Sequence, residues 1–384
     1  MLALACGCAA SYGRFERGVA EPPKDSIAIV VLGGAGARGR AEDDTARAVK
    51  DVLAASSTAD RDGVVLLVGD FAPHRYARGR GRGHRSRRSK GLGASPVVTS
   101  AVAASPRVGT RFAVRGVAER HHAAGNIEPV AHALVRIGAN GRGDTLSRCE
   151  GKTCTVTTPE APGLVDLVVL DLEPWRIPSK DDATAIARID GLLAAIAKMP
   201  ADTPRILVLS RPIEGAHETG LGAQSGGASG TAATFHLLPP ALQRQIQAGM
   251  FVGVIAGGER SLHLSRDLTG AIQRSDRVWL RAPVWQVISG NASDPSAGRV
   301  SRRAIWRGGI ANQPEVTTFS PGFAVVRVDG TDNLTIDLVA RRCGRWETAR
   351  ATLPLRPAPH PAETAVGELN PCPFCPGQQS GERP

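Results

Sequence analysis

An uninterrupted apolar run that stops abruptly at a carboxylate is the feature of this chain that most restricts its fold. Residues 63–70 read GVVLLVGD, five large apolar side chains followed by Gly69 and Asp70. Continuous Val and Leu without alternation is typical of a strand that is buried on both faces of its sheet. The same pattern recurs at residues 26–32, which end in a glycine-rich turn. Such strands need helices to cover them, so we expect an α/β protein.

Further strands and helices are expected along the chain. One helix begins near Ala41 and another spans residues 181–198, each with an apolar stripe at helical spacing. After Gly322, apolar and polar residues alternate in runs joined by turns such as Asp329-Gly330, which predicts antiparallel strands. Together these elements predict a two-sheet α/β/β/α sandwich. The other expected strands are Thr110–Arg115, Leu164–Asp171, Arg205–Ser210, Val252–Ala256 and Val284–Ser289.

Composition is that of a globular protein, and the length allows one large core or two smaller ones. The 384 residues are 42% hydrophobic and 22% charged, which is ordinary for a folded protein. The net charge is +11, but residues 75–90 carry eight Lys and Arg and no acid, which leaves +3 for the rest. A general affinity for nucleic acid therefore does not follow, and no sequence-specific nucleic acid partner is expected. The expected parts are a signal-like segment and tether at 1–24, a main domain at 25–355 with a basic insertion at 75–95, and a Pro-rich flexible tail at 356–384.

The first residues resemble the end of a bacterial lipoprotein signal. In MLALACGCAASYG, a short apolar run leads into small residues and then Cys6 and Cys8. The charged n-region is missing and the apolar stretch is short, so either the true start lies upstream or the terminus is apolar by chance. The signal interpretation, which we favour, predicts an exported, periplasmic or lipid-anchored protein, with the lipid on Cys6 or Cys8.

The cysteines fit an exported protein. Cys149 and Cys154 lie in a polar stretch where a short disulfide loop is expected in an oxidising compartment. Cys372 and Cys375 form CPFC in the tail, a pattern that also occurs in redox sites and half zinc sites. No second CxxC or His pair accompanies it, so we expect a local disulfide there.

The order and spacing of the strand ends carry a family likeness. The segments are VLGGAG (31–36), LLVGDF (66–71), FAVRGVAERHH (112–122), VVLDLEPW (168–175), LVLSRP (207–212), VGVIAGGERSLHL (252–264), VISGNAS (287–293) and the GFAVVRV strand from Gly322. Over residues 25–340 the chain resembles the calcineurin-like metallophosphoesterases, most closely the branch of purple and tartrate-resistant acid phosphatases. The resemblance implies a site in which two Fe, Mn or Zn ions activate a water and clamp phosphate oxygens. Carboxylate, amide and imidazole ligands from several strand ends would hold them.

Most of the family's ligand positions are changed here. The first aspartate position is Gly34, and the bridging aspartate is kept as Asp70 before Phe71, where the family has asparagine. The GNHD or GNHE motif reads GVAE at 116–119, a histidine pair before proline reads SRP at 210–212, and GHxH reads GGER at 257–260. The residues of this vestigial site are Gly34, Asp70, Phe71, Val117, Ala118, Glu119, Ser210, Arg211, Gly258, Glu259 and Arg260.

These departures predict a chain that is not an active phosphatase. Only Asp70, helped by Glu119, remains of the ligand set, and Gly, Val or Ala cannot replace imidazoles as ligands. No cofactor is therefore expected. The alternative is an active metal-dependent phosphatase with atypical ligands, for which nearby histidines would have to substitute. We expect those histidines to be surface or loop residues: His74, His121, His122, His217 and His263.

Arginines stand where histidines would have faced the metals. Arg211 and Arg260 beside Asp70, Glu119 and Glu259 predict a salt-bridged plug that replaces the charge of the cations. The other interpretation is that the two arginines form a pocket for an anionic ligand, such as a phosphate ester, without turnover.

The basic segment Arg75–Lys90 follows Asp70 and is expected near the mouth of the old site. It is either a solvated loop or a binding segment for an anionic ligand, such as an acidic cell-surface polymer or an anionic lipid headgroup, with only Tyr76 as an interleaved aromatic residue. The sequence thus predicts a degenerate metallophosphoesterase-like protein that acts as a binding or scaffold module of the cell envelope. An active phosphatase and a polyanion binder remain the alternatives.

Overall fold

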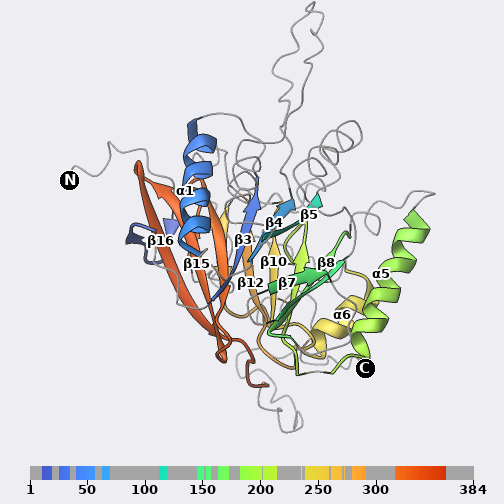
Figure 1. The fold of residues 1–384 in the computed structure, drawn as a ribbon. Coiled ribbons are helices and arrows are strands. Elements are labelled where there is room, and N and C mark those ends of the chain that lie inside the picture. Colours follow the sequence, from blue (N-terminus) through green and yellow to red (C-terminus); the bar gives the residue numbers. More distant parts are fainter. Residues whose placement is uncertain are drawn as a thin grey trace, which may run out of the picture.

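Two mixed sheets packed face to face form the body of the protein in a computed structural model, with helices on the outside (Figure 1). The structure describes residues 11–19, 26–34, 40–56, 63–69, 112–118, 145–150, 153–156, 163–172, 182–200, 202–213, 235, 238–258, 261–269, 272, 279–290 and 316–359. The expected two-sheet α/β/β/α sandwich is confirmed within these residues.

The first sheet, sheet A, has nine strands, of which β8, β9, β10 and β12 run parallel to one another. Short antiparallel strands complete it on both sides. In spatial order its strands are β1 (Ser11–Tyr12), β13 (Val316–Thr318), β11 (Leu262–Ser265), β12 (Trp285–Ser289), β10 (Gly253–Ala256), β9 (Arg205–Leu209), β8 (Val165–Leu170), β6 (Thr145–Glu150) and β7 (Thr153–Val156).

The second sheet, sheet B, has seven strands, and its β3, β4 and β5 are parallel. The expected strand at 110–115 is β5, which in the structure begins two residues later and ends three residues later. In spatial order the strands are β2 (Glu16–Arg17), β16 (Arg345–Pro354), β15 (Asn333–Arg342), β14 (Gly322–Val328), β3 (Ile27–Gly33), β4 (Gly63–Gly69) and β5 (Phe112–Ala118).

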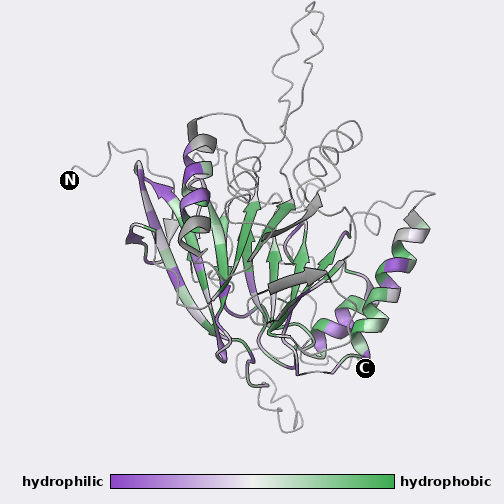
Figure 2. Ribbon diagram, in the orientation of Figure 1, coloured by the Kyte–Doolittle hydropathy of each residue, from purple (hydrophilic) through white to green (hydrophobic). Residues whose placement is uncertain are grey.

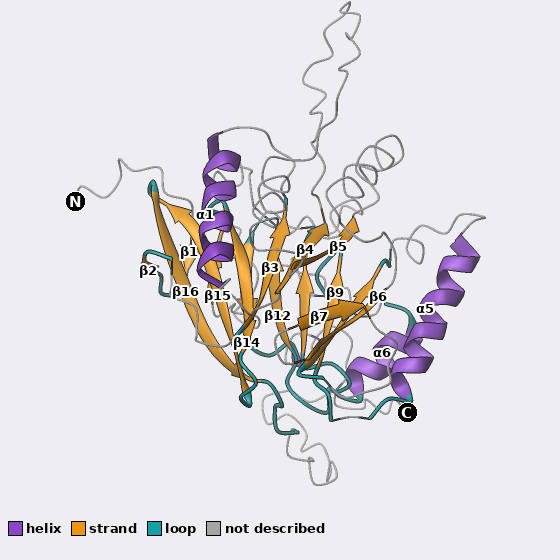
Figure 3. Cartoon of the chain, in the orientation of Figure 1, coloured by secondary structure: helices purple, strands orange, loops and turns teal. Residues whose placement is uncertain are grey.

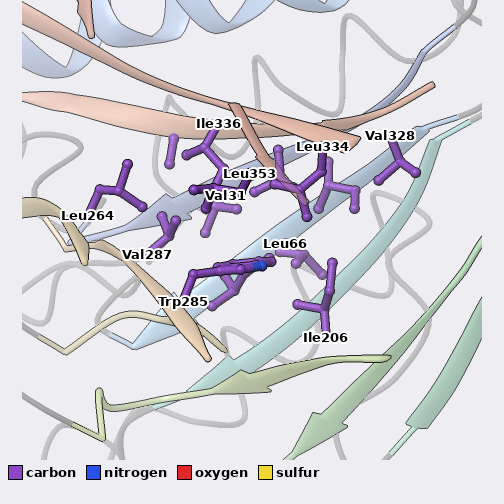
Figure 4. Close-up of a cluster of buried hydrophobic side chains, with 14 of the residues drawn as sticks. Val31, Leu66, Ile206, Leu264, Trp285, Val287, Val328, Leu334, Ile336 and Leu353 are labelled. Carbon is purple, nitrogen blue, oxygen red and sulfur yellow. The ribbon is translucent and has the colours of Figure 1, made fainter. Parts of the chain in front are cut away.

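The main core lies between the two sheets, where alternate residues of each strand interdigitate (Figure 4). Val31 and Leu66 of sheet B face Ile206 and Trp285 of sheet A in this cluster, and all four are at most 2% exposed. Each such side chain stabilises the fold by about 1.5–3 kcal/mol when it is fully buried. Continuous apolar runs predicted β3 and β4 because both of their faces are covered.

Three described helices cover the outer faces (Figure 3). The helix α1 (Arg40–Ser56) packs on sheet B against β3 and β14. The helices α5 (Asp182–Ala197) and α6 (Pro240–Gln247) pack on sheet A and form a second apolar cluster with its strands. Figure 2 shows hydrophilic residues along these helices, whereas the central strands of the two sheets are hydrophobic. None of the described helices is long and apolar enough to cross a membrane.

A short N-terminal segment, residues 11–18, joins the edges of the two sheets, and we call it the strap. Its β1 pairs with β13 of sheet A and its β2 pairs with β16 of sheet B. The backbone N–H of Gly18 donates to the Trp346 carbonyl at 2.9 Å, and Phe15 packs against the main core. We expected a tether in residues 1–24, but this part of it belongs to the folded body.

Candidate functional site

The parallel strands of both sheets end at one common edge of the sandwich, which we call the carboxyl edge. In sheet B, Gly33 is in register with Val68, and Gly69 with Ala118. In sheet A, Leu209 is in register with Leu170 and with Ala256, and Ala256 with Ile288. The residues that follow these strands therefore lie side by side in each sheet. Among the described residues these are Gly34 in sheet B and Asp171, Ser210 and Gly257 in sheet A, beside Ser289, the last residue of β12.

The two sheets touch through backbone atoms at this edge. A Cβ built on Gly69 would lie 2.2 Å from the backbone N of Gly258, closer than real Cβ contacts allow. A Cβ on Gly258 would lie 2.8 Å from the Ser210 carbonyl oxygen, and its φ of +74° is left-handed. That φ favours glycine, because an L side chain there crowds its own backbone. The ends of β4 and β10 thus meet through glycines, and the Ser210 carbonyl after β9 lies against Gly258.

Two hydrogen bonds fix the neighbouring strand ends. The Ser289 hydroxyl donates to the Val31 carbonyl at 2.8 Å and so ties β12 to β3 across the sandwich. After β9, the backbone N–H of Ile213 donates to the Gln286 side-chain oxygen at 2.8 Å. Gln286 is fully buried, so it holds the loop that carries Arg211. Sequence reasoning missed Gln286, although a lone amide in the apolar strand WQVIS was a signal for such a role.

The structure places part of the predicted vestigial site at this edge. Ser210 is buried and Arg211 is half-buried, and both lie beside Gly258. Gly34 follows β3 with a left-handed φ, and Val117 and Ala118 are the last two residues of β5. Asp70, Phe71, Glu119, Glu259 and Arg260 lie outside the described residues, so the salt-bridged plug stays a prediction. The same holds for Arg75–Lys90 and for Cys6, Cys8, Cys372 and Cys375.

Three described positions at the carboxyl edge lack side chains suited to a transition-metal ion. Gly34, Ser210 and Gly258 stand where the resemblance to metallophosphoesterases implies metal ligands, and they offer neither a carboxylate nor an imidazole. No group of three or more His, Cys, Asp or Glu side chains suited to a metal ion occurs among the residues that the structure describes. The contact between Gly69 and Gly258 also leaves the two sheets closely apposed here.

One of the candidate substitute histidines is placed differently from the sequence expectation. We expected His263 to be a surface or loop residue, but it lies in β11 and is only 4% exposed. Its Nε2 is 2.8 Å from the Ser265 hydroxyl oxygen. Burial lowers the pKa of His263 to about 4, because an imidazolium is poorly solvated there. The prediction failed because LHL is too short a run to distinguish a strand from a loop.

The strongest described electrostatic contacts lie inside the sheets. In sheet A, the fully buried Asp166 accepts from Arg148 Nε at 2.7 Å and lies 3.9 Å from Arg205 Nε. Arg205 also donates to the Pro200 carbonyl oxygen after α5. Burial lowers the pKa of Arg205, and the attraction of Asp166 opposes that shift. Asp166 therefore ties β6, β8 and β9 together.

Sheet B repeats this arrangement with Asp337 on β15, which lies between β14 and β16. Arg327 of β14 donates to Asp337 at 3.2 Å, and Arg350 of β16 donates to it at 2.7 and 2.9 Å. The hydrogen bond to Asp337 raises the pKa of Arg350. Sequence reasoning missed both arginine–aspartate–arginine clusters, because their partners lie on different strands and only the register brings them together.

The predicted Cys149–Cys154 loop lies in a β-hairpin. β6 and β7 pair with Cys149 directly opposite Cys154, and the Cys149 side chain is fully buried. We had interpreted this polar stretch as a loop, and its strands were not predicted.

Comparisons with known proteins show similarity at the level of the fold. No protein-family model matches the chain, and no curated protein matches it. Among solved structures, the Plasmodium protein described as GAP50, the anchor in the inner membrane complex, matches with a TM-score of 0.52 at 13% identity, over 87% of this chain and 90% of its own. The purple acid phosphatase PPD1 of yellow lupin matches with a TM-score of 0.45 at 10% identity, over 86% and 54%.

A third similar structure is the phosphopantetheinyl hydrolase PptH of Mycobacterium tuberculosis. It matches with a TM-score of 0.34 at 11% identity, over 69% of this chain and 90% of its own. The match to GAP50, with a TM-score of 0.52 at 13% identity, establishes a fold in common with that protein and carries no statement about activity.

Proposed function

We propose that this protein is a non-catalytic binding or scaffold module with a phosphoesterase-like fold. The observation that carries the proposal is the backbone at Gly258, where the resembled family has a histidine ligand. With a φ of +74° and a prospective Cβ at 2.8 Å from the Ser210 oxygen, this position does not accept a histidine without rearrangement. At Gly258, therefore, both the histidine side chain and a backbone conformation that suits it are missing.

A phosphatase assay with added Mn, Fe or Zn tests this proposal. The purified chain is expected to hydrolyse p-nitrophenyl phosphate no faster than its Asp70→Asn variant, because Asp70 is the one retained ligand of the family set. Turnover that depends on metal and is lost in Asp70→Asn would establish the alternative, an active phosphatase with atypical ligands.

We further propose that the module resides in the cell envelope, exported and held by a lipid on Cys6 or Cys8. The proposal is supported by the signal-like apolar run before these cysteines. It also draws on the similar fold of a protein described as an anchor in a membrane complex. Metabolic labelling with a fatty acid tests it: label is expected in the full chain and absent after Cys6→Ser with Cys8→Ser.

A second candidate function is the binding of a small anion by Arg211, with Arg260 as its partner. The supporting observation is that Arg211 is half-buried at the carboxyl edge, on a loop held by the buried Gln286. A guanidinium held this way can bind a phosphate through two hydrogen bonds. Inorganic phosphate measured by calorimetry is the probe, and Arg211→Gln is expected to abolish its binding. Binding that Arg211→Gln leaves unchanged would exclude this pocket.

We also propose a disulfide between Cys149 and Cys154, with a second one between Cys372 and Cys375. For the first pair, directly opposite residues of an antiparallel ladder have Cα atoms about 4.5–5.5 Å apart, which is within the range that a disulfide bridges. Mass spectrometry of non-reduced peptides is expected to find both pairs. A free thiol at Cys149 after oxidising export would contradict the first.

A further inference from the structure

One end of the sandwich carries a dense group of arginines. β15 runs in the same direction as β3, because both are antiparallel to β14. The β15–β16 turn at Cys343-Gly344 therefore lies at the carboxyl edge, beyond the strand ends of β3 and β4. Figure 2 shows hydrophilic residues at this end of the β15–β16 hairpin.

The strap and α1 add their own basic residues to this turn. Arg342 stands opposite Arg345 in the hairpin, and its guanidinium carbon lies 4.5 Å from the centre of the Phe15 ring of the strap. Arg17 of the strap stands opposite Glu347. Arg341 reaches Asp44 of α1 at 2.5 Å. We call this connected group the arginine tip: Arg14, Glu16, Arg17, Asp44, Arg47, Arg341, Arg342, Arg345 and Glu347.

The arginine tip has a surplus of positive charge. Its six arginines face three carboxylates, which leaves +3. The carboxylates are already engaged: Asp44 by Arg47 and Arg341 at 2.5 Å each, Glu347 by Arg342 at 2.6 Å, and Glu16 by Arg14 at 3.6 Å. Arg17 and Arg345 are exposed and make no ion pair with any other residue that the structure describes. The surplus charge is therefore presented to the surroundings.

Two further parts of the chain leave from the same edge. Ser11 stands opposite Thr318 at the end of β13, which runs parallel to β12, so the strap begins at the carboxyl edge. Cys8 precedes Ser11 by three residues, which can span at most about 10 Å. The basic segment Arg75–Lys90 begins six residues after Gly69, which is at that edge too.

We propose that this end of the molecule docks on an anionic phospholipid bilayer, with the arginine tip against the headgroup phosphates. This inference rests on the proposed function in the cell envelope. It adds which surface of the protein contacts the membrane and how the molecule is oriented on it. Guanidinium groups pair well with phosphate oxygens, and each basic side chain near an anionic bilayer adds to the attraction. A bilayer is favoured over a soluble polyanion because Ser11, which follows the lipid candidates Cys6 and Cys8 in the chain, lies at the same edge as the arginine tip.

Vesicle co-sedimentation of the full chain carrying Cys6→Ser and Cys8→Ser tests the proposal without any acyl chain. Binding to vesicles that contain phosphatidylglycerol, and not to phosphatidylcholine alone, is expected at low salt. Combining Arg14→Gln, Arg17→Gln and Arg345→Gln is expected to weaken it by roughly 10–100-fold. The matched control is Arg188→Gln, Arg281→Gln and Arg356→Gln, with the same change in charge at exposed arginines on α5 and at the opposite edge. It is expected to retain most of the binding, and thermal melting verifies that both triple variants fold.

Three outcomes would overturn the proposal. The first is that both triple variants lose vesicle binding equally, and the second is that the protein does not bind anionic vesicles at all. The third is that the tip variant loses retention on heparin while its vesicle binding is unchanged. The last outcome would assign the tip to a soluble polyanion. Metal content measured on the same preparation separates this proposal from the non-catalytic one. If the protein is metal-free and does not bind vesicles, only the bilayer proposal fails. If it contains metal and binds vesicles, only the proposal of a non-catalytic function fails.

Discussion

The sheet interiors and the carboxyl edge differ in the residues that hold them together. Inside the sheets, Asp166 and Asp337 are at most 1% exposed, and each is held between two arginines on neighbouring strands. At the carboxyl edge, where the resembled family gathers its metal ligands, Gly69 and Gly258 bring the two sheets into backbone contact. The buried charges that the structure describes thus hold neighbouring strands together, whereas the two sheets meet at the carboxyl edge through glycine backbone.

The largest expected effect comes from breaking the cluster around Asp166. Asp166→Asn removes the charge that compensates two arginines of at most 3% exposure, so unfolding free energy is expected to fall by about 3–5 kcal/mol. Urea denaturation measures it. Asp190→Asn on the exposed face of α5 is the control and is expected to change stability by less than about 0.5 kcal/mol. Similar small losses for both variants would show that the buried cluster contributes no more than a surface charge.

The pH dependence of stability tests the buried histidine. Because the folded pKa of His263 is lowered to about 4 from 6.5, the unfolded chain takes up a proton first as the pH falls. Stability from this group is complete above pH 6.5 and is lost toward pH 4, by about 3 kcal/mol in total. His263→Gln is expected to remove this slope in urea titrations at several pH values. An unchanged slope would mean that other groups cause it.

A smaller loss is expected for the cluster in sheet B. Asp337→Asn is expected to cost about 2–3 kcal/mol, because Arg350 is 38% exposed and can be solvated once its partner is neutral. Thermal unfolding compared with Asp166→Asn gives the order of the two effects. A larger loss of stability for Asp337→Asn than for Asp166→Asn would show that burial does not determine how much each cluster contributes.

The smallest effect is expected at the carboxyl edge. Gly258→His restores a histidine of the family motif, yet the left-handed φ and the Ser210 oxygen predict a loss of about 1–3 kcal/mol without metal binding. Calorimetry with Mn and Zn measures the binding, and Gly344→His at an exposed turn with a φ of +81° controls for the backbone strain alone. A metal site gained at Gly258 without loss of stability would show that the backbone still suits a ligand.

Long apolar runs made the parallel strands and the two long helices predictable. In α1, Ala46, Val49 and Val52 form the buried stripe that the spacing predicted, and α5 buries Ile189. The short strands β1, β2, β6, β7, β11 and β13 were missed, because polar residues interrupt them and only their partners make them strands. The helix α6 was missed as well, since it spans only eight residues.

The strand ends of the candidate site were predictable, but their contacts were not. Register and order along the chain place Gly34, Ser210 and Gly258 at one edge, which follows from parallel strands alone. The approach of Gly69 to Gly258 depends on how closely two sheets pack, and local sequence does not encode that distance. The same is true of Gln286, whose partner Ile213 is 73 residues away in the chain.

Elemental analysis of the purified full chain tests the central claim most directly. The protein is expressed with Mn, Fe and Zn supplied, dialysed mildly and measured for metal per chain, with its Asp70→Asn variant beside it. A non-catalytic module with a closed carboxyl edge is expected to hold no stoichiometric metal, and to give the same value as the variant. One or two ions per chain that Asp70→Asn removes, the content of a working dinuclear centre, would contradict the account.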